Sequence, residues 1–302
     1  MSTTRSLAAY ALSLFAALSL APGAASAGEV GLRPKFHKGD AFRYAIDGLA
    51  HNTTKAEMLP DGQSQQVVSQ ETRVSFKVVE VSDQDATIEA VYERIKMDVK
   101  SPMPGMPPAF DSDEPAEKDE GNTLAPVLRP IIGATITLKV ALSGAITEVK
   151  SPRPGEAAGQ FGALAGQFLD PGVVKSNFAW IFSLRNESGV AEVGSRWSVV
   201  EEQTLSPGAS LAEKFDLTLT AVEAEAAKVS LEGSSNLKVT GGQMQGAKTE
   251  DSSIKGAAVW DTGLGMLRTL DVKSFMRISA QPQEGMVLVL ETDRAQSLRR
   301  LD

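Results

Sequence analysis

The sequence predicts a mainly β protein, built as two related halves of curved antiparallel sheet with a short helical segment between them. Two observations carry this prediction. Apolar and polar residues alternate over long stretches on both sides of the centre, and turn residues separate these stretches. Residues 156–184 change instead to an apolar spacing of three to four residues, which is typical of amphipathic helices.

The first residues are typical of a secretory signal peptide. Arg5 supplies a positive charge, an uncharged apolar run extends from Leu7 to Leu20, and small residues precede a cleavage point after Ala27. We therefore expect residues 1–27 to be a signal peptide and the mature chain to be exported, to the periplasm or the medium. No later stretch of the sequence has the ~18 apolar residues of a membrane helix, so we expect no integral span in the mature chain.

The first β half is expected over residues 28–150. Its strands are predicted where apolar residues recur at every second position, between turns rich in Gly, Pro and Asp. The expected strands are 41–46, 72–81, 86–99, 135–142 and 145–149. A turn is expected at 60–62, and a short helix or an extended segment at 124–132.

Residues 101–122 differ from their surroundings because they combine five prolines with a run of acidic side chains. This composition predicts an exposed, solvated loop. The acidic side chains do not have the spacing of a calcium-binding loop: counted from Asp111, the sixth residue is Ala116 and the twelfth is Asn122, where glycine and glutamate are needed. We therefore predict no metal site.

The helical connector is expected over residues 151–190. One helix is predicted over Glu156–Leu169, and Asp170 can cap a second, which has Pro171 at its first position and extends to about Leu184. Large apolar side chains fall on one face of this pair. They are the candidate binding residues of the sequence, and their alternative role is ordinary core packing: Phe161, Phe168, Phe178 and Phe182.

The second β half is expected over residues 191–302, and it repeats features of the first. The segment K-G-D-A-F at 38–42 is matched by V-G-S-R-W at 193–197, since each has a glycine turn, a small polar residue and an aromatic residue that enters a strand. A turn and a hairpin follow in both halves. Two copies are too few for a solenoid, so the pattern predicts a duplicated β unit.

These motifs resemble an uncharacterised family of exported bacterial β-rich proteins, classified only as a domain of unknown function. The resemblance rests on K-G-D-A-F, on the pair Asp111-Ser112 after the proline-rich stretch, on the central helical region and on V-G-S-R-W, and it extends over residues 34–298. The second motif has Ser195 where aspartate is expected. The resemblance implies export and a β-rich fold, and it supplies no catalytic residues.

The composition argues against most catalytic chemistry. Cysteine is absent, and the only histidines, His37 and His51, are fourteen residues apart without ligand spacing, so we expect them to be exposed and without function. The sequence has no serine elbow and no phosphate-binding or dinucleotide-binding loop. A net charge of −8 disfavours nucleic acid as a partner. We expect no cofactor.

The sequence therefore predicts a non-catalytic exported binding or scaffold protein, whose partner is an unknown envelope protein or an apolar small molecule. An alternative is a periplasmic carrier of an apolar ligand such as a lipid or a lipoprotein, held between the sheet and the helices. A carboxylate-dependent hydrolase is a third hypothesis, because Asp and Glu are abundant.

Overall fold

The computed structural model describes residues 28–57, 59–101, 109–152, 162–206, 208–241, 246–283 and 286–301. Within these ranges, twelve strands join in one antiparallel sheet and two short strands pair beside it, so the predicted mainly β class is confirmed. The strands are β1 (Val30–Gly31), β2 (Ala41–Lys55), β3 (Gln63–Val81), β4 (Asp85–Lys100), β5 (Ala109–Asp111), β6 (Thr135–Ala141), β7 (Ile146–Lys150), β8 (Val190–Ala191), β9 (Arg196–Ser206), β10 (Ala209–Glu223), β11 (Ala226–Val239), β12 (Lys248–Asp261), β13 (Met266–Gln283) and β14 (Met286–Leu301). The α-helices are α1 (Ala125–Leu128), α2 (Gly162–Leu169) and α3 (Pro171–Phe182), and short 3-10 turns lie at Pro60–Gly62, Ala116–Asp119 and Arg129–Ile131.

The large sheet is continuous. Its strand order is β7-β6-β4-β3-β2-β14-β13-β12-β11-β10-β9, with β5 added beside β4. Strand β2 pairs with β14 without a register shift, from Arg43 opposite Leu301 to Lys55 opposite Val289. The early and late strands therefore share one sheet, and the predicted division into two halves does not appear as a break in it.

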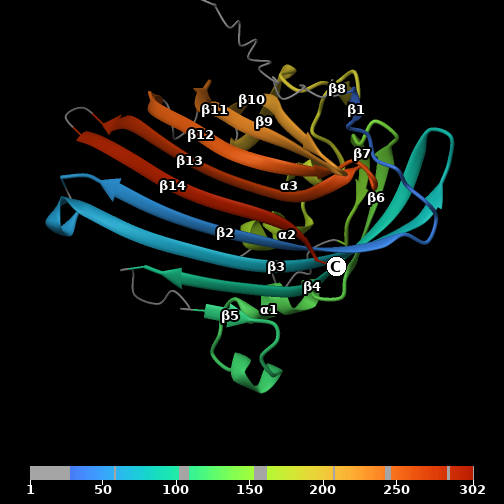
Figure 1. Cartoon of the computed structure of the whole chain (residues 1–302). Helices are drawn as coiled ribbons and strands as arrows, with labels where there is room; N and C mark the ends of the chain where they lie inside the picture. Colours follow the sequence, from blue (N-terminus) through green and yellow to red (C-terminus); the bar gives the residue numbers. More distant parts are fainter. Residues whose placement is uncertain are drawn as a thin grey trace, which may run out of the picture.

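The sheet is curved, and α2 and α3 lie on its concave side (Figure 1). Alternate side chains of the central strands point toward these helices, because successive residues of a strand face opposite sides. Phe76 of β3 packs edge-to-face against Phe178 of α3, with ring centroids 5.1 Å apart. Phe42 of β2 meets Phe182 at 6.1 Å. These rings are almost fully buried, so they form the centre of the core.

Helix α3 begins where the sequence predicts. The Asp170 carboxylate accepts hydrogen bonds from the backbone N–H groups of Gly172 and Val173, at 2.8 and 3.1 Å, and Pro171 occupies the first turn. This cap satisfies two donors that would otherwise lack partners in the helix. The helix ends at Phe182, two residues before the predicted end. Helix α2 is described from Gly162, so residues 156–161 of the predicted helix lie outside the described part of the chain.

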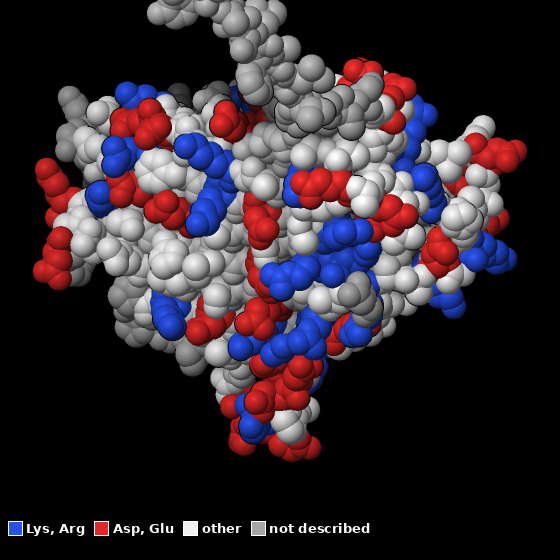
Figure 2. Space-filling model, viewed as in Figure 1, with Lys and Arg blue, Asp and Glu red and all other residues white. Residues whose placement is uncertain are grey.

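The other face of the sheet is polar. Arg43, Asp47 and Glu71 alternate with the core residues of β2 and β3 and are exposed. Figure 2 shows Lys and Arg interspersed with Asp and Glu over the sheet face turned toward the viewer. A shallow, open hollow of about 1010 Å³ lies on this convex face, among side chains of both signs such as Arg73, Asp271 and Lys273. Neighbouring opposite charges make this face well solvated.

The two glycine turns of the repeated motif have the same hydrogen bonding. In each, the glycine N–H donates to a carbonyl of the strand that returns beside it, and the N–H of the same strand residue donates to the polar residue after the glycine. The bonds are Gly39 N to Val78 O (2.8 Å) and Val78 N to Asp40 O (2.8 Å), and Gly194 N to Leu219 O (2.7 Å) and Leu219 N to Ser195 O (3.0 Å). Both glycines have a positive φ, 96° for Gly39 and 94° for Gly194, which favours glycine at each turn.

Candidate functional site

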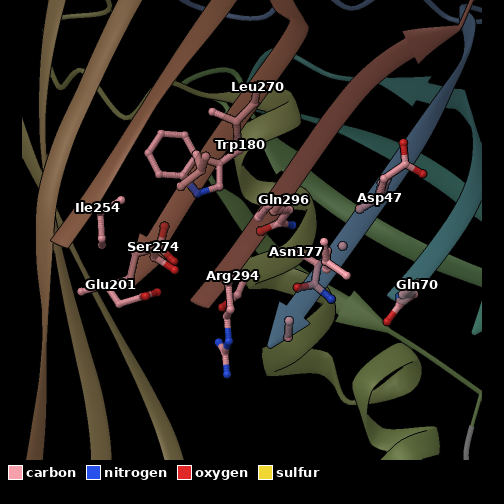
Figure 3. A pocket seen from close by; sticks show the side chains of 18 of the residues that line it. Asp47, Gln70, Asn177, Trp180, Glu201, Ile254, Leu270, Ser274, Arg294 and Gln296 are labelled. Atoms are coloured by element: carbon pink, nitrogen blue, oxygen red, sulfur yellow. The ribbon is translucent and has the colours of Figure 1, made fainter. Parts of the chain in front are cut away.

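The candidate site is a hollow of about 320 Å³ between α3 and the concave face of the sheet (Figure 3). Helix α3 contributes one wall, and strands β2, β3, β9, β10 and β12–β14 contribute the others. Both apolar and polar side chains line it, among them Asn177, Trp180, Gln70, Ile254, Ser274 and Arg294. It lies between two layers of the fold, whereas the hollow on the convex face lies on one surface of the sheet.

The hollow exists because the inward-facing residues change along each strand. On β2, the inward series Phe42, Tyr44, Ile46 continues as Gly48 and Ala50. The first residues of this series are large and meet the helices, whereas the later ones are too small to fill the concave side.

The same change occurs on neighbouring strands. On β3 the inward series runs from Phe76 and Val74 to Gln70, and on β14 it runs from Leu298 to Gln296 and Arg294. The concave face therefore has a filled half, which packs against α2 and α3, and an open half, where the inward residues of β2, β3 and β14 beside the hollow are small or polar while those of β12 and β13 stay mostly apolar. The hollow lies at the boundary between them.

A buried ion pair stands at the β9 side of the hollow. Arg185 Nη1 lies 2.5 Å from Glu201 Oε1, and both side chains are less than a quarter exposed. The Arg185 guanidinium also lies over the Trp180 ring, 5.0 Å from its centre. Arg185 has a left-handed backbone with a φ of 57°, which is unfavourable for a side chain of this size. The ion pair and the ring contact hold the residue in this conformation.

The protonation of Glu201 is perturbed. Burial raises the pKa of the Glu201 carboxyl, the charge of Arg185 lowers it, and the nearby Glu213 carboxylate raises it again, with a net upward shift. Glu213 lies directly opposite Glu201 on the paired strand β10, and Ser235 Oγ donates to it at 3.3 Å. Two like charges opposite one another on a sheet repel. Because the two carboxylates have one guanidinium, that of Arg185, between them, this side of the hollow carries excess negative charge.

Arg294 occupies the opposite side of the hollow, on β14. Its side chain is exposed, and no carboxylate of the described residues lies within ion-pair distance of it. Its strand neighbours across the sheet are Ser274 and Ala50, which are small and uncharged. Figure 3 shows the Arg294 side chain extending between Glu201 on one side and Asn177 on the other. The guanidinium is therefore available to a ligand.

A second buried carboxylate belongs to the filled half. Asp261 is 3% exposed and accepts from Arg300 at 2.7 Å, from Arg268 at 3.0 Å and from the backbone N–H of Leu264 at 3.0 Å. Burial alone would raise the pKa of Asp261, but these hydrogen bonds outweigh it and lower the pKa to about 2. Asp261 therefore stays ionised, and it ties β12 to β13 and β14.

Three of the four candidate phenylalanines are brought together, but as core residues. Phe168, Phe178 and Phe182 are at most 2% exposed. Tyr92 of β4 packs edge-to-face on Phe168 at 5.6 Å and donates to its carbonyl at 3.2 Å. None of the three lines the hollow. Phe161 lies outside the described residues.

The hollow has polar residues that the sequence reasoning missed. Glu201 and Arg294 were not among the candidate residues of the sequence. A signal was present in the alternation of β14, where Arg294 and Gln296 share the phase of the buried Leu298. A charged residue in the buried phase of a strand usually forms an ion pair, and Arg294 has no carboxylate partner among the described residues.

The two histidines are exposed, as predicted, and the tryptophans are buried or partly buried. His37 and His51 are exposed, and His37 Nδ1 is 3.3 Å from the Asp40 carboxylate in the turn before β2. Trp180 and Trp260 are buried. Trp197 is partly buried and donates from its indole N–H to the Leu184 carbonyl at 2.8 Å.

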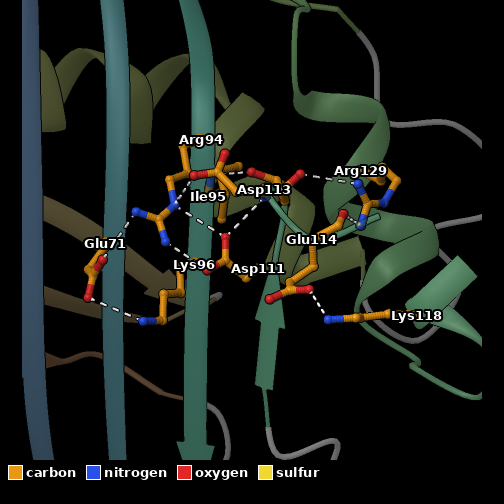
Figure 4. A network of polar contacts seen from close by, with 10 residues as sticks. Glu71, Arg94, Ile95, Lys96, Asp111, Asp113, Glu114, Lys118 and Arg129 are labelled. Atoms are coloured by element: carbon orange, nitrogen blue, oxygen red, sulfur yellow. Dashed lines mark hydrogen bonds and ion pairs between the residues drawn. The ribbon is translucent and has the colours of Figure 1, made fainter. Parts of the chain in front are cut away.

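Much of the described acidic segment is exposed, as predicted, but ion pairs also tie it to neighbouring elements (Figure 4). Asp111 ends β5 and pairs with Arg94 of β4, with an N–O distance of 2.7 Å, while Asp119 pairs with Arg129. The Arg94 hydrogen bond lowers the pKa of Asp111. These basic partners lie outside residues 101–122, so composition alone did not reveal them. Residues 102–108 are not among those described.

No group of three or more His, Cys, Asp or Glu side chains in the described ranges is placed to hold a metal ion. Within the same ranges, no helix has the length and apolar character needed to cross a membrane.

Comparisons with solved structures give distant likenesses. The chain aligns with lipovitellin, a structure titled for its lipid–protein interactions, at 11% identity and a TM-score of 0.46, covering 89% of this chain but 26% of that one. It aligns with an outer membrane channel of Pseudomonas putida F1 at 8% identity and a TM-score of 0.23, covering 89% and 97% of the two chains. A monoaromatic hydrocarbon channel, CymD, gives 7% identity and a TM-score of 0.26, with 88% and 89% covered. These scores are too low to support an inference.

The sequence comparisons are more specific. No curated protein matches the chain. One family profile matches residues 83–266, which is more than half of the chain and includes α2, α3 and the strands from β4 to β12. The chain therefore belongs to the family described as a "Family of unknown function (DUF6263)".

Proposed function

We propose that this protein is a non-catalytic binding protein that holds an apolar or amphipathic small molecule in the hollow between α3 and the open half of the sheet. One observation carries the proposal: beside α3, the inward-facing residues of β2, β3 and β14 become small or polar, which leaves about 320 Å³ next to an apolar floor formed by β12 and β13. This volume lies at the lower end of the ~300–1,000 Å³ that is usual for small-molecule sites.

The lining combines apolar and hydrogen-bonding side chains, as small-molecule sites do. Ile254, Leu270 and Val272 supply apolar surface, while Gln70, Asn177 and Ser274 supply hydrogen-bonding groups. An apolar floor supplies binding free energy through the hydrophobic effect, and a few polar groups fix the orientation of the ligand.

The Glu201–Glu213 pair is the feature that most favours the alternative, a carboxylate-dependent hydrolase. The raised pKa of Glu201, in a carboxylate that lines a hollow, is a common property of catalytic carboxylates. The contact with Arg185 supports a structural role instead, since that arginine occupies the carboxylate that would act on a substrate. We therefore retain a non-catalytic function.

Two broader elements belong to the same proposal. Export after cleavage near Ala27 would place the hollow in the periplasm or the medium, where an apolar molecule needs a carrier to cross water. A duplicated β unit, 28–150 and 191–302 around the connector 151–190, is supported by the matching hydrogen bonds of the Gly39 and Gly194 turns.

The proposal is tested with N-phenyl-1-naphthylamine, a neutral apolar fluorophore whose emission rises in dry sites. Ser274→Trp places a large ring in the hollow, and the matched control Lys273→Trp places the same ring on the opposite face of β13. We expect saturable binding to the unaltered protein and to Lys273→Trp, and a loss of at least about tenfold in affinity for Ser274→Trp. Equal affinity in all three proteins would contradict the proposal.

A further inference from the structure

We infer that the hollow selects an amphiphile with an anionic head, and that Arg294 receives that head. This inference rests on the proposed function and adds the class of ligand. The occupant is a single apolar chain that ends in a carboxylate or a similar anion. Four features of the structure lead to it: the free guanidinium, the separation of charge across the hollow, an adjoining apolar patch and the apolar alternation of β13.

The first feature is the state of Arg294. Several arginines of the sheet have carboxylate partners: Arg43 pairs with Glu93, Arg94 with Asp111 and Arg277 with Glu291. Among the arginines of the described strands without such a partner, which are Arg73, Arg196, Arg294 and Arg299, Arg294 alone lines the hollow. Arg294 lines the hollow and has no such partner among the described residues. A guanidinium offers five donors in a planar fork that matches a carboxylate, so an anionic ligand would complete its hydrogen bonding.

The second feature is where the negative charge lies. Glu201 and Glu213 belong to β9 and β10, while Arg294 is on β14, four strands from β10. At about 4.8 Å per strand, the path along the sheet from β14 to β10 is roughly 19 Å. Glu201 is already paired with Arg185, and Glu213 accepts from Ser235. An anionic head would therefore be drawn to the Arg294 side and repelled from the other.

The third feature is an apolar patch beyond the hollow. A second, smaller cluster of apolar residues lies apart from the main core, on β13 and β14, the strands of Ser274 and Arg294, and on β11 and immediately before β12. Its buried members are Leu237, Ala247 and Ile278, with Val239, Met276, Ala280 and Leu290 packed against them. On β14, Leu290 is four residues from Arg294 and shares its face of the strand.

The fourth feature is the alternation that joins these parts. On β13, the inward series Leu270, Val272, Ser274, Met276, Ile278 is apolar on both sides of a single serine. Arg294 lies directly opposite that serine on β14. An apolar chain can therefore extend from the guanidinium along the sheet in either direction and bury its methylene groups, each worth about 0.8 kcal/mol.

The experiment displaces N-phenyl-1-naphthylamine from the full chain with three ligands that share a twelve-carbon tail: dodecanoate, dodecanol and protonated dodecylamine, all below their micellar concentrations. The variants are Arg294→Gln, Arg294→Lys and, as the control of opposite charge in the same hollow, Glu213→Gln. Thermal unfolding of each variant checks that the fold is retained, which we expect because the Arg294 side chain is exposed.

We expect Arg294→Gln to weaken dodecanoate about tenfold and dodecanol less than about twofold, because only the charged head uses the guanidinium. Arg294→Lys should restore part of the lost affinity, and Glu213→Gln should leave dodecanoate unweakened. Stronger binding of dodecylamine than of dodecanoate, or equal losses for dodecanoate and dodecanol, would overturn the inference. Absence of probe binding to the unaltered protein would instead contradict the proposed function on which it rests.

Discussion

The filled and open halves of the concave face are made by the same strands, yet they differ in what their inward residues do. In the filled half, Tyr44, Phe76 and Leu298 are at most 1% exposed and pack into the core below α3. In the open half, the same strands carry Ala50, Gln70 and Arg294 in the same phase. A continuous sheet thus combines a packed core with a binding surface by changing side-chain size along each strand.

The largest effect is expected in the filled half. Phe178→Ala removes a ring that is 1% exposed and contacts Phe76 at 5.1 Å. The free energy of unfolding should fall by about 3–5 kcal/mol, since a cavity would remain where the ring was. Urea unfolding measures this. A loss under about 1 kcal/mol would mean that α3 is not packed as described.

The next effect concerns the buried charge of the filled half. Asp261→Asn keeps the shape but leaves Arg300 and Arg268 without their carboxylate, so unfolding should become about 3 kcal/mol easier at pH 7. The pKa of about 2 lies below the ordinary 3.8, so this stabilisation is present above pH 4 and is lost as the pH falls toward 2.

The pH dependence of the unfolding free energy is the control for the role of the Asp261 carboxylate. Between pH 5 and pH 2.5, the difference in unfolding free energy between the unaltered protein and Asp261→Asn should shrink by roughly 2 kcal/mol, because each pKa unit corresponds to about 1.4 kcal/mol. A difference that stays constant over this range would contradict the assigned role of the carboxylate.

A smaller effect is expected at the boundary between the two halves. Glu201→Gln leaves Arg185 buried without a counter-charge, and we expect a loss of about 2 kcal/mol. Arg185→Met should cost a similar amount, because the contact with the Trp180 ring is also lost. The double variant should lose less than the sum of both. Additive losses in urea unfolding would show that the ion pair contributes no coupling.

The smallest effect is expected in the open half. Gln296→Ala changes an exposed side chain that lines the hollow, so unfolding should change by no more than about 0.5 kcal/mol. The affinity for N-phenyl-1-naphthylamine should change more than the stability does. A loss of stability comparable to that of Phe178→Ala would remove the distinction between the two halves.

Local patterns in the sequence predicted much of the fold. Period-two alternation located the strands around Phe76 and Ile88, and Asp170-Pro171 located the start of α3. These features depend on neighbours in the chain. The pairing of β2 with β14 joins residues far apart in sequence, and no local pattern encodes it.

The site was harder to predict for the same reason. Aromatic residues on an amphipathic helix, such as Phe178 and Phe182, pack into the core and do not form a binding surface. The hollow depends on the position of α3 relative to strands β12–β14, and only the tertiary structure gives this position. Arg94 and Arg129 likewise pair with the acidic segment from outside it.

The central claim is that ligand enters the open half and leaves the filled half unchanged. Methyl-labelled protein titrated with N-phenyl-1-naphthylamine tests it directly, because ring currents shift nearby methyl resonances. We predict shifts for Ile254, Leu270 and Val272, which line the hollow, and none for Ile136 and Leu138, which are fully buried in the core. Shifts centred on Ile136 and Leu138, or none at the hollow residues at saturating probe, would contradict the account.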